Sequence, residues 1–288
     1  GGENDIGYIA QPPDYWQKDT NSHGTHVAST ILGYSHTLGP VNGVAPLATV
    51  IPVKVLSNAG SGWSAPIAAG IVYVADLKAG PLKRYPVVIN MSLGGPELDA
   101  IEKAAIDYAI SKGVIIVASA GNLGATGMGY PGAYEPVIAV AASGWVGEWT
   151  ATSWWRTLDV PDPTVPEDFY ITDFSSRALE GQDLDVAAPG SWVVGAYQVS
   201  SAEITYYYLG GTSMASPHVA GIVALLAQKY PKLNAGEAED ILEASAIYLA
   251  PGCRWVNDPD LGLLEFCWGA DATGAGLATA DAALALTP

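Results

Sequence analysis

The feature that most constrains this chain is an alternation of apolar runs and helical patterns in its first half. The runs Thr49–Leu56, Val87–Met91 and Val114–Ser119 are short and mostly apolar, which indicates buried strands. Helical patterns separate them, at about Ser64–Lys78 and Leu98–Ser111. Strands and helices in this order require right-handed crossovers, which place the strands in one parallel sheet. We therefore predict an α/β fold of three layers, with a mainly parallel sheet and helices on both faces.

The rest of the chain shows no internal repeat and no linker between domains. We therefore treat residues 1–288 as one domain and expect residues 145–172, with several Trp and an acidic, Pro-rich run, to form an inserted surface loop. Further elements are expected as short strands at Pro136–Ala142, Asp185–Pro189, Trp192–Ala196 and Ile204–Leu209, and as a helix at Ala235–Ala246 capped by Asn234.

Composition narrows the classes of partner. The chain is 49% hydrophobic and 14% charged, as in a folded globular protein, and its net charge is −17. Such acidity excludes nucleic acid and an anionic membrane surface as partners, because both need clustered Lys and Arg. No apolar run approaches the roughly 18 residues of a spanning helix.

The two cysteines, Cys253 and Cys267, flank a loop rich in Trp, Asp and Gly. We expect a disulfide between them, which implies an oxidising compartment and a secreted protein. A loop of about 15 residues closed in this way adds roughly 3 kcal/mol of stability. Two free thiols are the alternative.

Ser213 lies where the glycine-rich turn of Gly210–Gly221 enters an apolar helix. Free N–H groups and the helix dipole would meet a negative charge formed there, which favours a nucleophile. The alternative is a serine that only caps the helix. His23 and His26 begin another helix that runs to about Leu32, capped by Asn21 or Ser22. Their spacing is not that of a zinc protease, and a core position suits His26 better than His23.

Five motifs stand in order along the chain: Asn21–Ala28 around His23, Ser92–Gly95, Ala120–Asn122, Tyr130–Gly132 and Gly211–Gly221 around Ser213. Together they resemble the subtilisin-like serine proteases, from about residue 19 to the end. An α/β-hydrolase fits less well, because it needs Gly-x-Ser-x-Gly and a histidine far beyond the serine. Here Ala215 occupies the last motif position, and His218 is too close to Ser213 to act as its base.

The resemblance implies a role for each matching residue. Ser213 would be the nucleophile, and His23 would take its proton and return it to the leaving amine. Asn122 would donate to the oxyanion together with the N–H of Ser213.

The same resemblance implies where a peptide substrate binds. The segment Ser92, Leu93 and Gly94 would form one wall of the primary specificity pocket. An extended chain would lie between the edge of that segment and an opposing edge of Gly60, Ser61 and Gly62. Ala118 to Gly121, including Ala120 and Gly121, would form the other wall of the primary pocket. Leu123 stands where some relatives carry an acid. We find no acid in these segments and expect large apolar or aromatic groups at P1.

The third member of the expected triad is missing from its usual place. In relatives an aspartate ends an apolar strand some thirty residues or more before the histidine, whereas here only 22 residues precede His23. Asp5, Asp14 and Asp19 follow no run of β-branched residues. We expect the domain to be N-terminally incomplete, with the aspartate on an upstream segment or separate piece, which would then be a partner, as would a propeptide.

The expected chemistry needs no cofactor, although the family often carries structural calcium. The stretch Gly33–Asn42 lacks carboxylates, so a calcium site there is doubtful, and the metal ligands are unknown. The acidic loops Asp159–Asp168 and Asn257–Asp260 would suit calcium, and equally a solvated surface. Asp185 resembles a structural residue of the family rather than a catalytic acid.

Two functions follow from these features. The first is a secreted serine endopeptidase that works through an acyl-enzyme, although this chain alone would lack activity without the upstream aspartate. The second is an inactive peptide-binding module or processed fragment of the same fold. Intact Ser213, His23 and Asn122 favour the enzyme, because a binding module has no use for all three.

Overall fold

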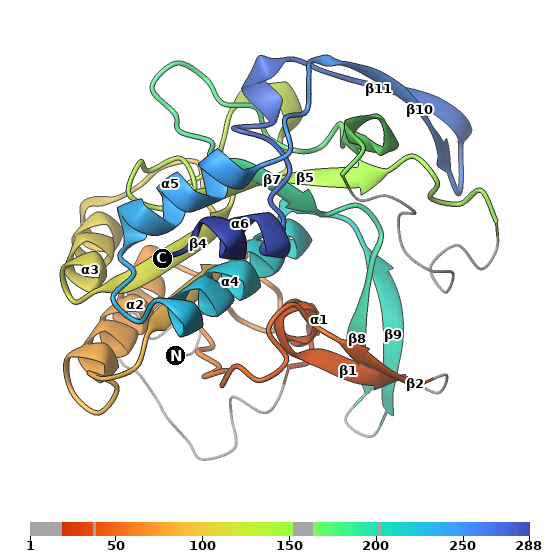
Figure 1. Ribbon diagram of the computed structural model, residues 1–288. Coiled ribbons are helices and arrows are strands. Elements are labelled where there is room, and N and C mark those ends of the chain that lie inside the picture. The colour runs from red at the N-terminus through yellow and green to blue at the C-terminus, as the bar shows by residue number, and fades with distance from the viewer. Residues whose placement is uncertain (1–18, 37–38, 152–163, 201–202) are drawn as a thin grey trace.

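The computed structural model describes residues 19–36, 39–151, 164–200 and 203–288 (Figure 1). Its centre is a sheet whose strands β3 (Val87–Met91), β4 (Val114–Ser119), β5 (Ile138–Trp145) and β7 (Val186–Pro189) run parallel. Val140 pairs with β4 on one edge and with β7 on the other. A short strand, β6 (Phe169–Ile171), pairs antiparallel with the end of β5.

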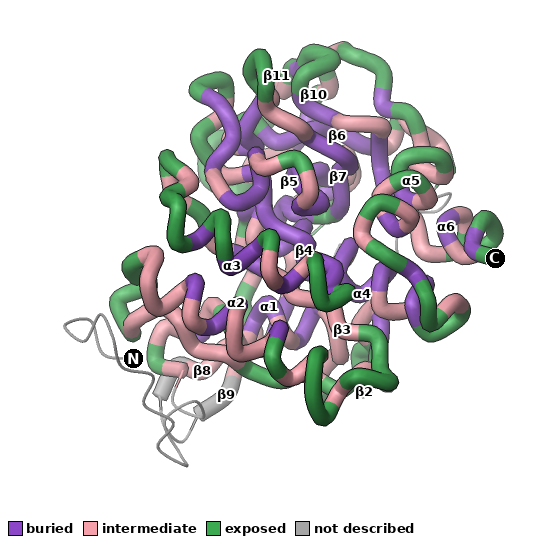
Figure 2. Tube along the Cα trace, turned by 90° about the vertical axis from the view of Figure 1, so that its left-hand side faces the viewer, coloured by how far each residue is buried: buried purple, intermediate pink, exposed green. Residues whose placement is uncertain are grey.

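Helices cover both faces of this sheet, as the sequence predicts. Ile116 and Ala118 of β4 pack with α2 (Ser64–Ala79) and α3 (Ala100–Ser111). Ile115 and Val117, which point the other way, pack with α4 (Thr212–Lys229), α5 (Ala235–Ser245) and α6 (Ala280–Leu286). β4 is buried along its whole length, and Figure 2 shows burial concentrated on the central strands. The three-layer α/β prediction is therefore confirmed.

In the described part of the chain, three hairpins lie outside the sheet. The first joins β1 (Gly33–His36) to β2 (Gly39–Asn42), and the second joins β8 (Val193–Ser200) to β9 (Glu203–Leu209) beside α1 (His23–Leu32) (Figure 1). The third joins β10 (Gly252–Asp258) to β11 (Gly262–Trp268). Cys253 and Cys267 face each other across it and form a disulfide of 2.04 Å, so the predicted bond is confirmed.

The structure corrects three local predictions. Residues 49–56 form no regular strand, because they have no ladder partner among the described residues. The predicted surface loop 145–172 ends in a buried strand, β6, while residues 152–163 of it lie outside the described part. Neither predicted side chain caps α1: the Ser22 hydroxyl bonds the carbonyl of Gln198, and the Asp19 carboxylate accepts from the backbone N–H groups of Ser22 and Thr25.

Asn234 does cap α5, and Glu237 reaches back to its N–H in a full capping box. Within the described residues, no helix is both long and apolar enough to cross a bilayer.

Candidate active site

Ser213 lies in the first turn of α4, as predicted. Its N–H has no acceptor among the described residues, whereas the neighbouring N–H of Met214 is bonded to Gly211 at 2.9 Å. The glycine-rich turn is fastened to the chain after β7 by a bond of 2.8 Å from the Gly211 N–H to the Gly190 carbonyl. A free donor at a helix N-terminus is therefore held beside the Ser213 hydroxyl.

Asn122 follows β4 and reaches the same turn. Its Oδ1 accepts from both the backbone N–H and the hydroxyl of Thr212, at 2.9 Å each. The Thr212 hydroxyl in turn accepts from the N–H of Gly121 at 3.1 Å. Because these contacts occupy the amide oxygen, the Nδ2 group of Asn122 is the part left to donate to a substrate. The sequence analysis did not predict a role for Thr212. The structure shows that Thr212 precedes Ser213 in α4 and binds the Asn122 amide.

Ser92 ties the end of β3 to the helix that carries Ser213. Its hydroxyl lies 2.7 Å from the Ser213 carbonyl and 2.8 Å from the Ser216 hydroxyl, and the side chain is buried. The hydroxyl of Ser213 donates a long bond of 3.5 Å to the Ser92 carbonyl. These contacts fix the position of the α4 N-terminus relative to the carboxyl edge of the sheet.

His23 is the first residue of α1, which packs against α4 (Figure 1). Burial lowers the pKa of its imidazole, and the nearby Asp19 carboxylate acts in the opposite sense. The lowered pKa favours the neutral ring that a general base requires. Within the described residues no hydrogen bond joins this ring to Ser213.

The carboxylate whose charge acts on His23, that of Asp19, binds the helix rather than the ring. Asp19 accepts from Ser22 N–H at 3.0 Å, and from the N–H and hydroxyl of Thr25 at 2.8 and 2.7 Å. Both of its oxygens are thus committed to the first turn of α1. Asp5 and Asp14 lie outside the described residues.

Two other histidines have structural positions. His26 is fully buried, with its Nε2 3.0 Å from the Val193 carbonyl and 3.2 Å from that of Tyr207. His218 bonds the Met214 carbonyl within α4 at 2.9 Å, and burial lowers its pKa to about 4. The expectation that His26 is a core histidine agrees with this burial.

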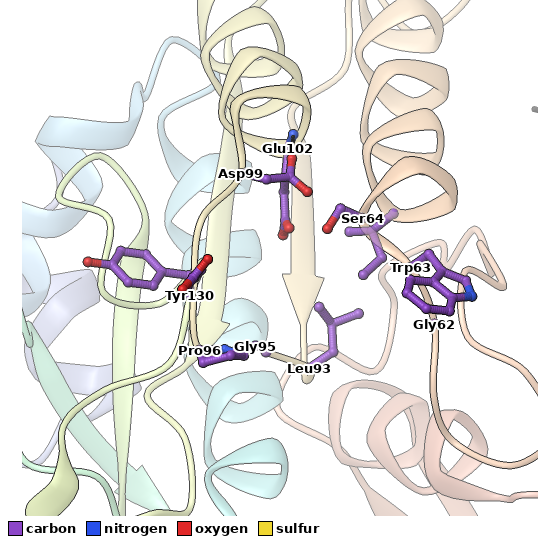
Figure 3. A pocket seen from close by; sticks show the side chains of 12 residues that line it. Gly62, Trp63, Ser64, Leu93, Gly95, Pro96, Asp99, Glu102 and Tyr130 are labelled. Carbon is purple, nitrogen blue, oxygen red and sulfur yellow. Dashed lines mark hydrogen bonds between the residues drawn. The ribbon is translucent and has the colours of Figure 1, made fainter. Parts of the chain in front are cut away.

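The two predicted substrate edges lie on either side of one hollow (Figure 3). Gly62 borders it at the start of α2, and Leu93 and Gly94 border it after β3. Gly60 and Ser61 are exposed beside Gly62 in the same turn, with Gly60 at φ +83. The structure therefore brings together both segments that the resemblance assigns to an extended substrate.

Ala120 and Gly121 follow β4 and precede Asn122. Ala120 is fully buried, and Gly121 has φ +107. A Cβ at Gly121 would lie 2.9 Å from the Ser176 hydroxyl and 3.2 Å from the Gly129 nitrogen. Glycine is therefore required at this wall both by conformation and by space.

One group of carboxylates has the composition of a cation site. Oxygens of Asp183, Asp185 and Glu239 lie within 4.8 Å of one another. Asp185 is fully buried; its Oδ2 accepts from the Ala139 N–H at 2.6 Å, and its Oδ1 has no partner in the described part of the chain. Burial, followed by repulsion from Glu239, raises its pKa to about 8. These oxygen donors fit a hard cation such as calcium.

The two acidic loops that the sequence suggested for calcium do not provide comparable clusters of carboxylates among the described residues. Residues 159–163 lie outside the described part, and Asp258 uses its Oδ1 to accept from the N–H groups of Asp260 and Leu261 in the β10–β11 turn. That carboxylate closes a hairpin.

Known proteins are similar to this chain in both sequence and fold. A family model described as "Peptidase_S8: Subtilase family" matches residues 3–278. The chain belongs to the subtilase family. Subtilisin DY from Bacillus licheniformis is 38% identical over 238 residues, which are 81% of this chain and 73% of the relative.

Other relatives agree with this assignment. Subtilisin E from Bacillus subtilis is 38% identical over 236 residues, 81% of this chain but 52% of the relative, so the chain spans about half of its length. The solved structure of Sphericase superposes with a TM-score of 0.69 at 31% identity, covering 91% of this chain and 78% of that one. The resemblance drawn from the motifs is confirmed, as is a subtilisin-like fold.

Proposed function

We propose that this subtilase is a serine endopeptidase with Ser213 as nucleophile, His23 as general base and Asn122 as oxyanion donor. The observation that carries the proposal is a pair of donors at the start of α4 for which the described residues offer no acceptor. The Ser213 N–H lacks an acceptor among the described residues, and the Asn122 amide is oriented by Thr212. Such donors stabilise charge that develops on a carbonyl oxygen.

The reaction would proceed in two steps, acylation of Ser213 and hydrolysis of the resulting ester. The Ser213 hydroxyl oxygen bonds the substrate carbonyl carbon while its proton passes to His23, and the carbonyl oxygen becomes the oxyanion. The C–N bond then breaks, and His23 gives the proton to the leaving amine. Water repeats the sequence on the ester, and its proton moves through His23 back to Ser213.

This chemistry requires a rearrangement of the Ser213 side chain. Its hydroxyl donates to the Ser92 carbonyl at 3.5 Å, so it must turn toward His23 before transfer. The bond is long, and therefore weak, so little opposes that rotation.

The group that orients His23 is proposed to come from outside the described residues. Asp19 cannot supply it without releasing the N–H groups of Ser22 and Thr25. The natural substrate class is polypeptide, with large apolar or aromatic groups preferred at P1. The disulfide between Cys253 and Cys267 supports the proposal of an oxidising, extracellular location.

A structural cation is the second part of the proposal. Asp183, Asp185 and Glu239 would hold calcium, whose charge would relieve their mutual repulsion. The chemistry at Ser213 needs no cofactor.

The alternative, a peptide-binding module without turnover, is favoured by the lack of a His23–Ser213 hydrogen bond among the described residues. Hydrolysis of a mixed fluorogenic peptide library separates the two. When the segment that carries the orienting acid is present, we expect turnover that Ser213→Ala abolishes. Asn122→Ala should reduce turnover by about 10²–10³-fold, which is the loss known for this donor in subtilisin itself and not a value worked out from this geometry. Peptide binding without any turnover would favour the alternative.

A further inference from the structure

The hollow between the two substrate edges has a volume of about 280 Å³. The start of α2, the chain after β3 and the first turn of α3 enclose it (Figure 3). Its volume is just below the roughly 300–1,000 Å³ typical of small-molecule pockets. This volume is sufficient for one side chain of a bound peptide.

Glu102 forms the inner end of this pocket. Its side chain is only 5% exposed, and Figure 3 shows the carboxylate pointing from α3 toward Leu93. No hydrogen bond or ion pair to this carboxylate occurs among the described residues. A buried carboxylate without a partner is costly, so a cationic group placed beside it would gain free energy.

The surroundings of Glu102 are acidic. Glu97 and Asp99 also line the pocket, and none of the described lining residues is cationic. Asp99 is committed to the N–H groups of Ile101 and Glu102 at 2.9 Å each. Burial and the Asp99 charge raise the pKa of Glu102 to about 6, so the group is still mostly ionised at neutral pH.

Lys103, the cationic residue next to Glu102 in sequence, is bound to other residues. Lys103 bonds Asp107 at 2.8 Å and the Tyr134 hydroxyl at 2.7 Å, which is a contact within α3 and to the loop before β5. The charge of Glu102 is thus left for something that enters the pocket.

The walls suit the stem of a long cationic side chain. Ile67 and Leu93 contribute apolar surface, and the ring of Trp63, which is 64% exposed, stands at the side (Figure 3). Lysine and arginine bury their methylene groups on such surfaces and favour aromatic rings near their charge.

We propose that this pocket selects a lysine or arginine side chain of the peptide substrate, with Glu102 as the specificity-determining residue. The inference rests on the proposed function only in taking the two flanking edges as the substrate path. The pocket shares Leu93 and Gly94 with one expected wall of the P1 site, but Ala120 and Gly121 of the other wall do not line it, so we take it as a separate pocket.

Binding to the full chain with Ser213→Ala tests the proposal without requiring catalysis. Fluorescence anisotropy would compare labelled peptides that differ only by lysine or norleucine at one position, with each position tested in turn. At one position we expect lysine to bind about tenfold more tightly, the scale of one partly desolvated charge pair. Glu102→Gln should abolish that preference, and Glu102→Leu should reverse it in favour of norleucine.

Glu180→Gln is the matched control, because it removes one exposed carboxylate that does not line the pocket. It should leave the lysine preference intact. Thermal unfolding of each variant shows that it is folded. The proposal is overturned by equal binding of both peptides at every position, by a preference that survives in Glu102→Gln, or by no binding at all.

The two proposals fail separately. If the protein with Ser213 intact and with the segment that carries the orienting acid binds lysine peptides preferentially yet hydrolyses nothing, the endopeptidase proposal falls and the pocket assignment stands. If it hydrolyses peptides with no charge preference at any position, the reverse holds.

Discussion

Glu148 offers the sharpest test of how burial of a carboxylate changes its pKa and the stability of the protein. Its side chain is 2% exposed and accepts from the Trp145 N–H and from the hydroxyls of Tyr170 and Ser191, at 3.0, 3.1 and 2.7 Å. Ser191 follows Gly190, whose carbonyl holds the turn at Gly211. Burial outweighs the three donors and raises the pKa of Glu148 from 4.5 to about 7.

The raised pKa of Glu148 determines how the stability of the protein changes with pH. Because the folded state holds the proton more tightly, the contribution of Glu148 to stability is full below pH 4.5 and is lost as the pH rises to about 7. The two pKa values differ by roughly 2.5, which corresponds to a loss of about 3 kcal/mol. Glu148→Gln does not titrate, so it should lose none of this.

The assay is urea unfolding of the parent and of Glu148→Gln at several pH values between about 4 and 8. We expect the difference in unfolding free energy to shift by about 3 kcal/mol in favour of the glutamine variant as the pH rises. A difference that does not change with pH, or one that shifts in favour of the parent, would refute the reasoning. It would mean that the three donors hold the carboxylate ionised.

Three further predictions concern the site and its supports. Thr212→Val removes one of the two bonds that orient the Asn122 amide, so kcat on a peptide substrate should fall about tenfold with little change in KM; an unchanged kcat would show that Thr212 does not position it. Asp19→Asn should lower the stability of the protein by about 1 kcal/mol through weaker capping of α1, and NMR titration should show a further lowered pKa of His23; a raised pKa would contradict the assigned charge effect. Replacing both Cys253 and Cys267 by serine opens a 14-residue separation and should cost about 3 kcal/mol in thermal or urea unfolding, whereas no loss would mean that the β10–β11 ladder alone holds the hairpin.

Much of the fold could be predicted because its strands are buried on both sides. Val114–Ser119 is apolar except for its last residue and is flanked by helical patterns, which together indicate a central parallel strand. The helix at Ser64–Ala79 and the capping box at Asn234 follow from signals within a few residues of each other.

The predictions that were wrong concern residues whose structure depends on partners distant in sequence. Residues 49–56 have the composition of a strand, but a strand also needs a neighbour, and sequence composition cannot supply one. Ser22 looked like a helix cap because its type and place fit, yet its hydroxyl is taken by Gln198, 176 residues away. Such competition appears only in three dimensions.

The candidate site divides in the same way. The positions of Ser213 and Asn122 could be predicted because Ser213 begins a helix and Asn122 follows a strand, whereas their roles come from the resemblance and are proposals. Glu102 was missed because it follows the helix cap Asp99 by three residues and reads as a favourable acid in a first turn. Only packing against α2 shows that its carboxylate is buried in a pocket.

The central claim is that the Ser213 hydroxyl is a nucleophile supported by its own N–H and by Asn122. Incubating the full-length protein, including the segment that carries the orienting acid, with a fluorophosphonate and mapping the adduct by mass spectrometry tests it most directly. We predict one adduct, on Ser213, that forms much more slowly in His23→Ala and in Asn122→Ala. An intact Ser213 after prolonged exposure, or a rate of labelling indifferent to both substitutions, would contradict the account.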